Sequence, residues 1–200
     1  MIKIGLTGSI ASGKTEVTNI LKKMRIPVFD ADAMVHQFYE DGTAAGLLKP
    51  FCPQAISNHR VDRELLGQYI AKHPTFLKQL EAIIHPLVQE AQEQFINTQR
   101  KLNYKLVVID SPLLIETGQY KNMDVVVVIT TSTKLQKQRA LQRKGMTETK
   151  LEFMLSKQMP AFEKIKYATH VIVNEGTLEN LHQKVTSTFR SIQEKANQHA

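Results

Sequence analysis

The sequence contains a single cysteine, no tryptophan and no long apolar run among its 200 residues. Because Cys52 has no second cysteine to pair with, a disulfide within the chain is excluded, which fits a reducing compartment. The longest purely apolar run, residues 125–129, is much shorter than the roughly 20 residues of a membrane-spanning helix. The first residues enter a motif directly, without the regions of a secretion signal. We therefore expect a soluble, cytoplasmic protein that does not enter a membrane.

Aromatic residues are also scarce, at 6% of the chain, whereas basic residues are in excess. The 26 Lys and Arg residues outnumber the 19 Asp and Glu residues, and the net charge of +7 suits a polyanionic ligand such as a nucleotide or a nucleic acid. No basic stretch interleaved with aromatic residues is evident, so we expect no nucleic-acid partner. With 42% hydrophobic residues, the chain can bury a sizeable core in one compact domain with insertions or in two small lobes.

Short apolar runs, most of them rich in β-branched residues, alternate with segments of helical spacing. Continuous runs of this kind are typical of strands that are buried on both faces of a parallel sheet. The alternation with helices indicates an α/β fold with a doubly wound, parallel, five-stranded sheet. The predicted strands are residues 2–6, 27–29, 106–109, 125–129 and 171–173.

The first predicted strand leads into Gly8-Ser9-Ile10-Ala11-Ser12-Gly13-Lys14-Thr15, which matches the phosphate-loop pattern G-x-x-x-x-G-K-[ST] in full. Glycines let such a loop turn its backbone N–H groups toward phosphate oxygens, and the helix that follows adds its positive N-terminal end. We expect Lys14 to reach the β- and γ-phosphates of ATP and the Thr15 hydroxyl to bind Mg²⁺. The predicted ATP-binding residues of this region are Gly8, Ala11, Ser12, Gly13, Lys14, Thr15 and Glu16.

A phosphate loop occurs in kinases, GTPase switches and ATP-driven machines. The chain has no Asn-Lys-x-Asp motif for recognising guanine, and 200 residues are few for a motor. Two inserted helical stretches fit the P-loop kinase fold of small nucleotide-type kinases. We predict a nucleotide-binding core made of residues 1–32, 101–132 and 168–200, a helical substrate-binding lobe of residues 33–100 and a helical lid of residues 133–167.

Within the predicted lobe, residues 41–62 are rich in glycine and proline and are expected to be irregular. A long helical pattern follows over residues 74–100. Pro86 interrupts this pattern, and the residue before a proline is biased away from helix. We therefore expect a kink at His85.

The predicted lid carries two arginines, Arg139 and Arg143, which are four residues apart and are expected to share a helix face. Guanidinium groups match phosphate oxygens and suit a flap that closes over a triphosphate. We assign Arg139 to catalysis and Arg143 to ATP binding. A solvated basic face is the alternative, because Lys134, Lys137 and Lys144 lie nearby.

Acidic residues follow two of the predicted strands, at the edge where parallel sheets bind ligands. Asp32 is the candidate catalytic base that accepts the proton of an acceptor hydroxyl. Asp30 is an alternative Mg²⁺ ligand through water, and one of these two is expected to cap the next helix. Asp110 ends the run 106–109, and we predict that it binds the metal together with Thr15. A strand-end cap is the alternative for Asp110.

Further motifs, in this order and spacing, resemble the dephospho-CoA kinase family over residues 4–181. Those motifs are Asp30-Ala31-Asp32, His85-Pro86, Asp110-Ser111-Pro112-Leu113-Leu114-Ile115-Glu116, the series Gln136, Arg139 and Arg143, then Gln158, and finally Asn174-x-Gly176. Three positions depart from the usual family pattern: Ser9 and Cys52 stand where glycines are usual, and Thr169 stands where an aspartate is usual.

The resemblance implies an ATP-dependent kinase that transfers the γ-phosphoryl group to the ribose 3′-hydroxyl of dephospho-CoA and gives coenzyme A and ADP. It implies Mg²⁺ with ATP as cofactor, and ATP and dephospho-CoA as partners. We expect a monomer, with a small homo-oligomer left open. The resemblance places Asn174 and Gly176 at the adenine. The substrate-binding residues that it implies are Asp32, His85, Pro112, Leu113, Leu114 and Glu116; Lys14 and Arg139 act with Asp32 in catalysis.

Two other functions remain open. One is a P-loop kinase for another small alcohol or a nucleoside monophosphate, because acceptor choice resides in the lobe that the sequence specifies least. The other is an ATP-switched regulatory or nucleic-acid-binding module, which the net charge of +7 permits.

Overall fold

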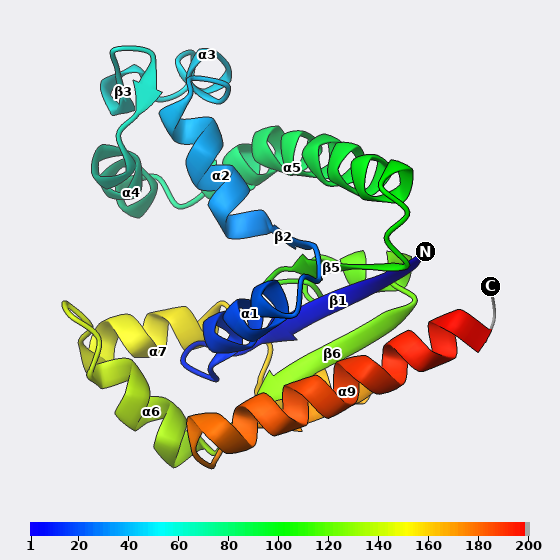
Figure 1. Ribbon diagram of the computed structural model, residues 1–200. Coiled ribbons are helices and arrows are strands. Elements are labelled where there is room, and N and C mark those ends of the chain that lie inside the picture. The colour runs from blue at the N-terminus through cyan, green and yellow to red at the C-terminus, as the bar shows by residue number, and fades with distance from the viewer. Residues whose placement is uncertain (199–200) are drawn as a thin grey trace. The chain divides into compact units, whose positions relative to one another are not determined.

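A computed structural model describes residues 1–198, with side chains described to Lys195. Its centre is a five-stranded sheet with the strand order β2-β5-β1-β6-β7 (Figure 1). The strands are β1 (Ile2–Gly8), β2 (Val28–Asp30), β5 (Leu106–Asp110), β6 (Val125–Thr130) and β7 (His170–Val173). The pairs of β1 with β5, β1 with β6, and β6 with β7 are parallel. The predicted doubly wound, five-stranded P-loop kinase sheet is confirmed.

Helices connect and cover the strands. They are α1 (Lys14–Lys23), α2 (Ala31–Glu40), α3 (Ala45–Leu48), α4 (Arg63–Lys72), α5 (Phe76–Lys101), α6 (Thr133–Leu141), α7 (Glu148–Ser156), α8 (Ala161–Lys164) and α9 (Leu178–Gln198). Short 3-10 helices are η1 (Pro53–Ala55), η2 (Gln119–Asn122) and η3 (Ile165–Tyr167). Within residues 1–198, no helix is both long and apolar enough to cross a membrane.

The chain divides into two compact units. The core unit consists of Met1–Phe29 and the residues from Thr98 onward, and the inserted unit is Asp30–Asn97. The core unit holds the phosphate loop and most of the sheet, and the inserted unit holds α2 to α4 and most of α5.

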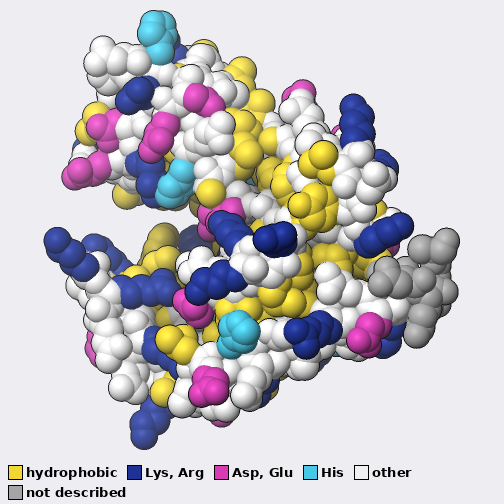
Figure 2. All heavy atoms as spheres, in the orientation of Figure 1, with side chains coloured by type: hydrophobic (Ala, Val, Ile, Leu, Met, Phe, Trp, Pro, Cys, Tyr) yellow, Lys and Arg dark blue, Asp and Glu magenta, His cyan; other side chains and the backbone are white. Residues whose placement is uncertain are grey.

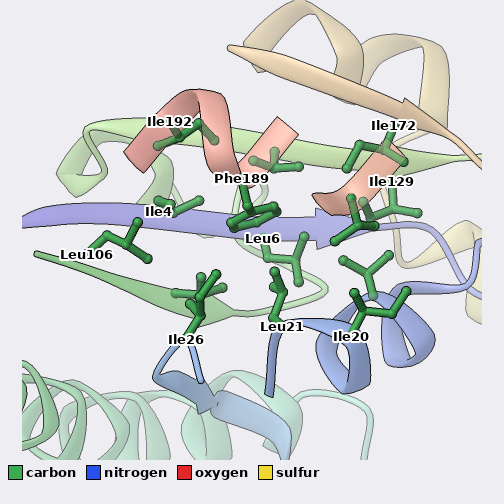
Figure 3. Packing of buried hydrophobic residues seen from close by; sticks show 14 of the residues in the cluster. Ile4, Leu6, Ile20, Leu21, Ile26, Leu106, Ile129, Ile172, Phe189 and Ile192 are labelled. Atoms are coloured by element: carbon green, nitrogen blue, oxygen red, sulfur yellow. The ribbon is translucent and has the colours of Figure 1, made fainter. Parts of the chain in front are cut away.

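The main hydrophobic core lies between one face of the sheet and the helices α1 and α9 (Figures 1 and 3). Ile4 and Leu6 of β1 point toward this face, where they meet Leu21 of α1 and Phe189 of α9, all wholly buried. On the opposite face, Leu114 and its neighbours pack over the alternate residues of the strands. Burial on both faces explains why these strands read as continuous apolar runs.

The inserted unit corrects one expectation. The stretch 41–62 contains α3, η1 and a two-stranded hairpin of β3 (Ile56–Ser57) and β4 (Arg60–Val61), rather than irregular chain. The turn residues Asn58 and His59 have φ angles of 50° and 60°, the left-handed values that a two-residue hairpin turn requires. The hairpin was missed because its turn lacks glycine.

The long helical pattern predicted over 74–100 is confirmed by α5, which continues through Pro86 over 26 residues. The kink expected at His85 stays a prediction. Cys52 is wholly buried and its Sγ contacts the Leu48 carbonyl at 3.4 Å, so the thiol is a packed structural group. Burial raises its pKa, which disfavours the reactive thiolate.

Candidate phosphate-transfer site

The phosphate loop, residues 8–15, joins the end of β1 to the first turn of α1. Gly13 caps α1 with a left-handed φ of 96°, and its carbonyl accepts hydrogen bonds from the N–H groups of Glu16 and Val17. A side chain at Gly13 would overlap the amide of Asn174. At Gly8, an added Cβ would lie 2.7 Å from the Ile129 carbonyl oxygen. Both positions therefore require glycine because a side chain would overlap its neighbours, and Gly13 is required also by its left-handed backbone conformation.

Three side-chain amides from other segments of the core unit brace this loop. Gln136 of α6 donates to the Ile10 carbonyl at 3.0 Å, and Gln158 accepts from the Ile10 N–H at 3.0 Å. Asn174, just after β7, donates to the Ser12 carbonyl at 2.9 Å. The sequence pattern contained these residues, but their contacts to the loop backbone were not foreseen.

Lys14 extends from α1 to the end of β5. Its Nζ lies 2.5 Å from Asp110 Oδ1, and the Thr18 hydroxyl donates to Asp110 Oδ2 at 2.7 Å. The Asp110 side chain is only 2% exposed, so this carboxylate depends on its partners for compensation of its charge. Lys14 and Asp110, both predicted for the site, thus meet directly. Thr18 was not predicted, although its place one turn after Lys14 on the helix is the signal for it.

Thr15 is exposed in the first turn of α1, beside the half-buried Glu16. Among the residues described, no group of three or more His, Cys, Asp or Glu side chains could hold a metal ion. Mg²⁺ is often bound by one or two protein oxygens together with substrate phosphates and water. The exposed Thr15 hydroxyl and the Asp110 carboxylate, which faces Lys14 and Thr18, are oxygen donors of the chemical type that such a site uses.

Arg139 lies in the last turn of α6, where its guanidinium donates to the backbone carbonyl of Asn174 at 3.0 Å. The expectation that Arg143 shares its helix face is wrong. The helix ends at Leu141, and Arg143 lies exposed in the turn that leads to Gly145, whose φ is 75°. Gly176 is exposed two residues beyond Asn174.

Residues 111–116, which we call the acceptor loop, follow Asp110. The Ser111 N–H donates to the Leu6 carbonyl at 3.0 Å, which ties the loop to β1. Pro112 is half-buried and Leu113 is exposed, whereas Leu114 is wholly buried over Gly5. The side chain of Leu114 therefore supports the loop from the interior.

Glu116 ends the acceptor loop in a polar cluster. Its Oε1 lies 3.0 Å from Lys164 Nζ and accepts the Met159 N–H at 2.8 Å. Burial lowers the pKa of Lys164, and the opposite charge of Glu116 counteracts that shift. The Oε1 atom of Glu116 is thus occupied by protein groups of the predicted lid.

The remaining predicted residues belong to the inserted unit. Asp30 is the N-cap of α2 and accepts the Ala33 N–H at 2.9 Å, which confirms that one of the two aspartates caps this helix. Asp32 is exposed in the first turn of α2, and His85 is exposed on α5.

Within the core unit, a cavity of about 420 Å³ opens between the end of β6 and the lid segment. Its polar lining comes from the loop residue Ser9 and from Thr130, Gln136 and Gln158; its apolar lining includes Met159 and Phe162. The surface seen in Figure 2 mixes Lys and Arg with acidic and neutral side chains. The Lys and Arg side chains, although in excess over the acidic ones, thus form no continuous band on the face shown.

Comparison with known proteins gives one consistent family. Residues 2–180 match the model of the dephospho-CoA kinase family. The dephospho-CoA kinase of Rhizobium etli is 42% identical over 172 residues, which cover 86% of this chain and 84% of that protein. That of Bartonella quintana is 39% identical over 189 residues, 94% of this chain and 97% of that one. The crystal structure of TT1252 from Thermus thermophilus matches with a TM-score of 0.81 at 31% identity, over 95% of this chain and 97% of that chain.

Proposed function

This chain belongs to the dephospho-CoA kinase family, and on that premise we propose that it transfers the γ-phosphoryl group of ATP to the ribose 3′-hydroxyl of dephospho-CoA. The products are coenzyme A and ADP. The observation that carries the proposal is the pairing of Lys14 with Asp110 beneath a complete phosphate loop, within a chain that matches this family from residue 2 to 180.

The phosphate loop supplies the donor half of the site. Its N–H groups and the start of α1 bind the phosphates, and Lys14 exchanges Asp110 for the β- and γ-phosphates when ATP arrives. The amides of Gln136, Gln158 and Asn174 hold the loop in shape before ATP binds. Phosphoryl transfer depends mainly on positioning and charge neutralisation, so a preformed loop contributes directly to the rate.

Mg²⁺ accompanies ATP in this proposal. The residues that would hold it are Thr15 and Asp110, and when bound it neutralises phosphate charge. Asp30 is the weaker candidate, because its carboxylate already accepts the Ala33 N–H.

Asp32 accepts the proton of the acceptor hydroxyl and aligns its oxygen for attack. His85, Pro112 and Leu113 contact dephospho-CoA. Leu114 and Glu116 were also predicted to bind it, but we propose instead that they support the acceptor loop, because Leu114 is wholly buried and Glu116 faces Lys164. Arg139 neutralises charge on the phosphoryl group in transfer, Arg143 contacts ATP, and Asn174 and Gly176 border the adenine. These roles carry the family's residue pattern onto this chain.

The proposed organisation has a core of residues 1–32, 101–132 and 168–200, a substrate lobe of 33–100 and a lid of 133–167. Closure of the lid excludes water and so limits ATP hydrolysis. We propose that the chain acts as a monomer in the cytoplasm.

The test is ATP consumption with one acceptor at a time: dephospho-CoA, each nucleoside monophosphate, shikimate as an unrelated alcohol, and single-stranded DNA. Consumption that requires dephospho-CoA supports the proposal. Stimulation by a nucleoside monophosphate alone would identify a different small-molecule kinase, and stimulation by DNA alone would identify the regulatory module.

A further inference from the structure

Lys164 is a charged residue that the phosphate chemistry does not use. It is the last residue of α8, and its side chain is completely buried in the core unit. A buried ammonium is costly unless it is paired and hydrogen-bonded. The contacts of Lys164 therefore indicate what this buried charge does.

Those contacts all lead to the acceptor loop. Lys164 Nζ donates to the Pro112 carbonyl at 2.6 Å and lies 3.0 Å from Glu116 Oε1. The Pro112 carbonyl also accepts the Thr7 hydroxyl at 3.1 Å, so it is held from β1 as well. One ammonium thus binds the second and the last residue of the six-residue loop 111–116.

A second connection runs through the backbone of the lid segment. The Met159 N–H donates to the same Glu116 oxygen that faces Lys164. Its neighbour Gln158 binds the N–H of Ile10 in the phosphate loop. Residues 158–164 thereby hold the donor loop at one end and the acceptor loop at the other.

The acceptor loop is placed where small displacements matter. It starts directly after Asp110, whose carboxylate binds Lys14. Pro112 is half-buried and Leu113 is exposed, while Leu114 is fixed in the core. A shift of the Pro112 carbonyl would move these two side chains together.

We propose that Lys164 is a positioning residue, which with Glu116 fixes the acceptor loop so that Pro112 and Leu113 meet dephospho-CoA in the reactive arrangement. This inference rests on the proposed function. Lys164 itself touches neither substrate. Its loss weakens the use of dephospho-CoA more than the use of ATP.

If the pair of Lys164 and Glu116 were purely structural, its removal would affect stability alone. Removing one partner of a buried pair destabilises the fold, whereas replacing both by apolar side chains of similar size often restores stability. The double variant Lys164→Met/Glu116→Leu therefore restores packing without restoring the hydrogen bond to Pro112. The double variant thus separates the effect on stability from the effect on the position of the acceptor loop.

The experiment compares the wild type, Lys164→Met, the double variant and the control Lys166→Met, which removes an exposed lysine two residues away. Tm, kcat and the KM of each substrate are measured. Lys164→Met is expected to lower Tm by about 10 °C, and the double variant to regain most of that loss. Both should raise the KM of dephospho-CoA roughly tenfold, with the KM of ATP within about twofold. Lys166→Met should match the wild type.

A folded double variant with the wild-type KM for dephospho-CoA would overturn the inference and leave the pair a structural one. If the double variant does not fold, the single variant Lys164→Met, assayed at a temperature at which its melting curve shows it folded, answers the same question, because it also lacks the hydrogen bond to the Pro112 carbonyl. An unchanged KM in that variant would equally overturn it. A wild type that does not use dephospho-CoA refutes the proposed function itself, so the two failures are distinguishable.

Discussion

The side-chain amide of Asn174 donates to the backbone carbonyl of Ser12 across 2.9 Å. This contact joins the residue after β7 to the phosphate loop that follows β1, two segments that are 162 positions apart in sequence. The backbone carbonyl of Asn174 also accepts a hydrogen bond from the guanidinium of Arg139. Asn174 thus links the donor loop to the proposed catalytic arginine.

Gly13→Ala should disrupt this link. The left-handed φ of 96° costs a non-glycine residue about 1–2 kcal/mol, and the added Cβ also overlaps the Asn174 amide. We expect a loss of at least that free energy of unfolding and about tenfold weaker ATP binding, measured by chemical denaturation and nucleotide titration. The control is Gly67→Ala in the interior of α4, where a Cβ meets open space and should stabilise the fold by about 1 kcal/mol. Equal effects of the two changes would contradict this assignment.

Asp110→Asn should raise the Mg²⁺ concentration that gives half-maximal activity by about 10- to 100-fold. The amide keeps the size of the side chain but removes the charge that faces Lys14 and the proposed cation. The measurement is activity as a function of free Mg²⁺ at saturating ATP. Asp124→Asn, at an exposed aspartate that accepts the Lys3 N–H, should leave the curve unchanged. An identical shift in both variants would remove Asp110 from the metal site.

Asp32→Asn should lower chiefly the turnover rate, whereas Asp30→Ala should lower chiefly the stability. Asp32→Asn is expected to lower kcat about 10²- to 10⁴-fold with Tm preserved, because a general base is lost. Asp30→Ala removes the N-cap of α2 and should cost about 1 kcal/mol of stability, with a smaller effect on kcat. Steady-state kinetics and thermal melts of both variants decide the assignment. Near-normal turnover in a folded Asp32→Asn protein would exclude the base role.

Arg139→Ala should lower kcat about 10²-fold and the affinity for ATP much less, because the guanidinium acts on charge that develops during transfer. Lys137→Ala is the matched control on the same helix. Lys137 forms only an exposed ion pair with Glu148, at 3.0 Å, and such pairs contribute about 0–1 kcal/mol. Single-turnover rates together with equilibrium nucleotide binding separate the two quantities. A fall in binding alone would reassign Arg139 to ground-state recognition.

The buried Lys164 should also leave a signature in the pH dependence of stability. Its pKa is lowered in the folded chain, chiefly by burial, with Lys14 adding to the shift and Glu116 opposing it. Between that lowered pKa and the unfolded value of 10.5, the unfolded chain binds more protons. The free energy of unfolding of the wild type should therefore rise with pH in this window relative to Lys164→Met. Parallel curves for the two proteins would contradict the lowered pKa.

Local pattern was enough to predict the sheet and the donor loop. The apolar runs at 106–109 and 125–129 are continuous because both faces of β5 and β6 are buried, so they were recognisable without tertiary information. The phosphate loop was recognisable because its glycines and Lys14 are required by backbone conformation and phosphate chemistry.

Long-range contacts could not be predicted in the same way. Lys164 lies in the charged stretch Glu163-Lys164-Ile165-Lys166, and nothing in that spacing distinguishes the buried lysine from the exposed one. Its burial follows from the partner Glu116, 48 positions earlier in the chain. Likewise, spacing alone put Arg143 on a helix that ends before it, at Leu141.

The proposed function is tested most directly by the position of the new phosphate. Wild-type protein is incubated with ATP, Mg²⁺ and dephospho-CoA, and the product is examined by ³¹P–¹H correlation NMR. We predict one new phosphomonoester, coupled to the ribose H3′, in equal amount to the ADP that forms. ADP formed without a new ester, or an ester at any other position, would contradict the assignment of this chain as a dephospho-CoA 3′-kinase.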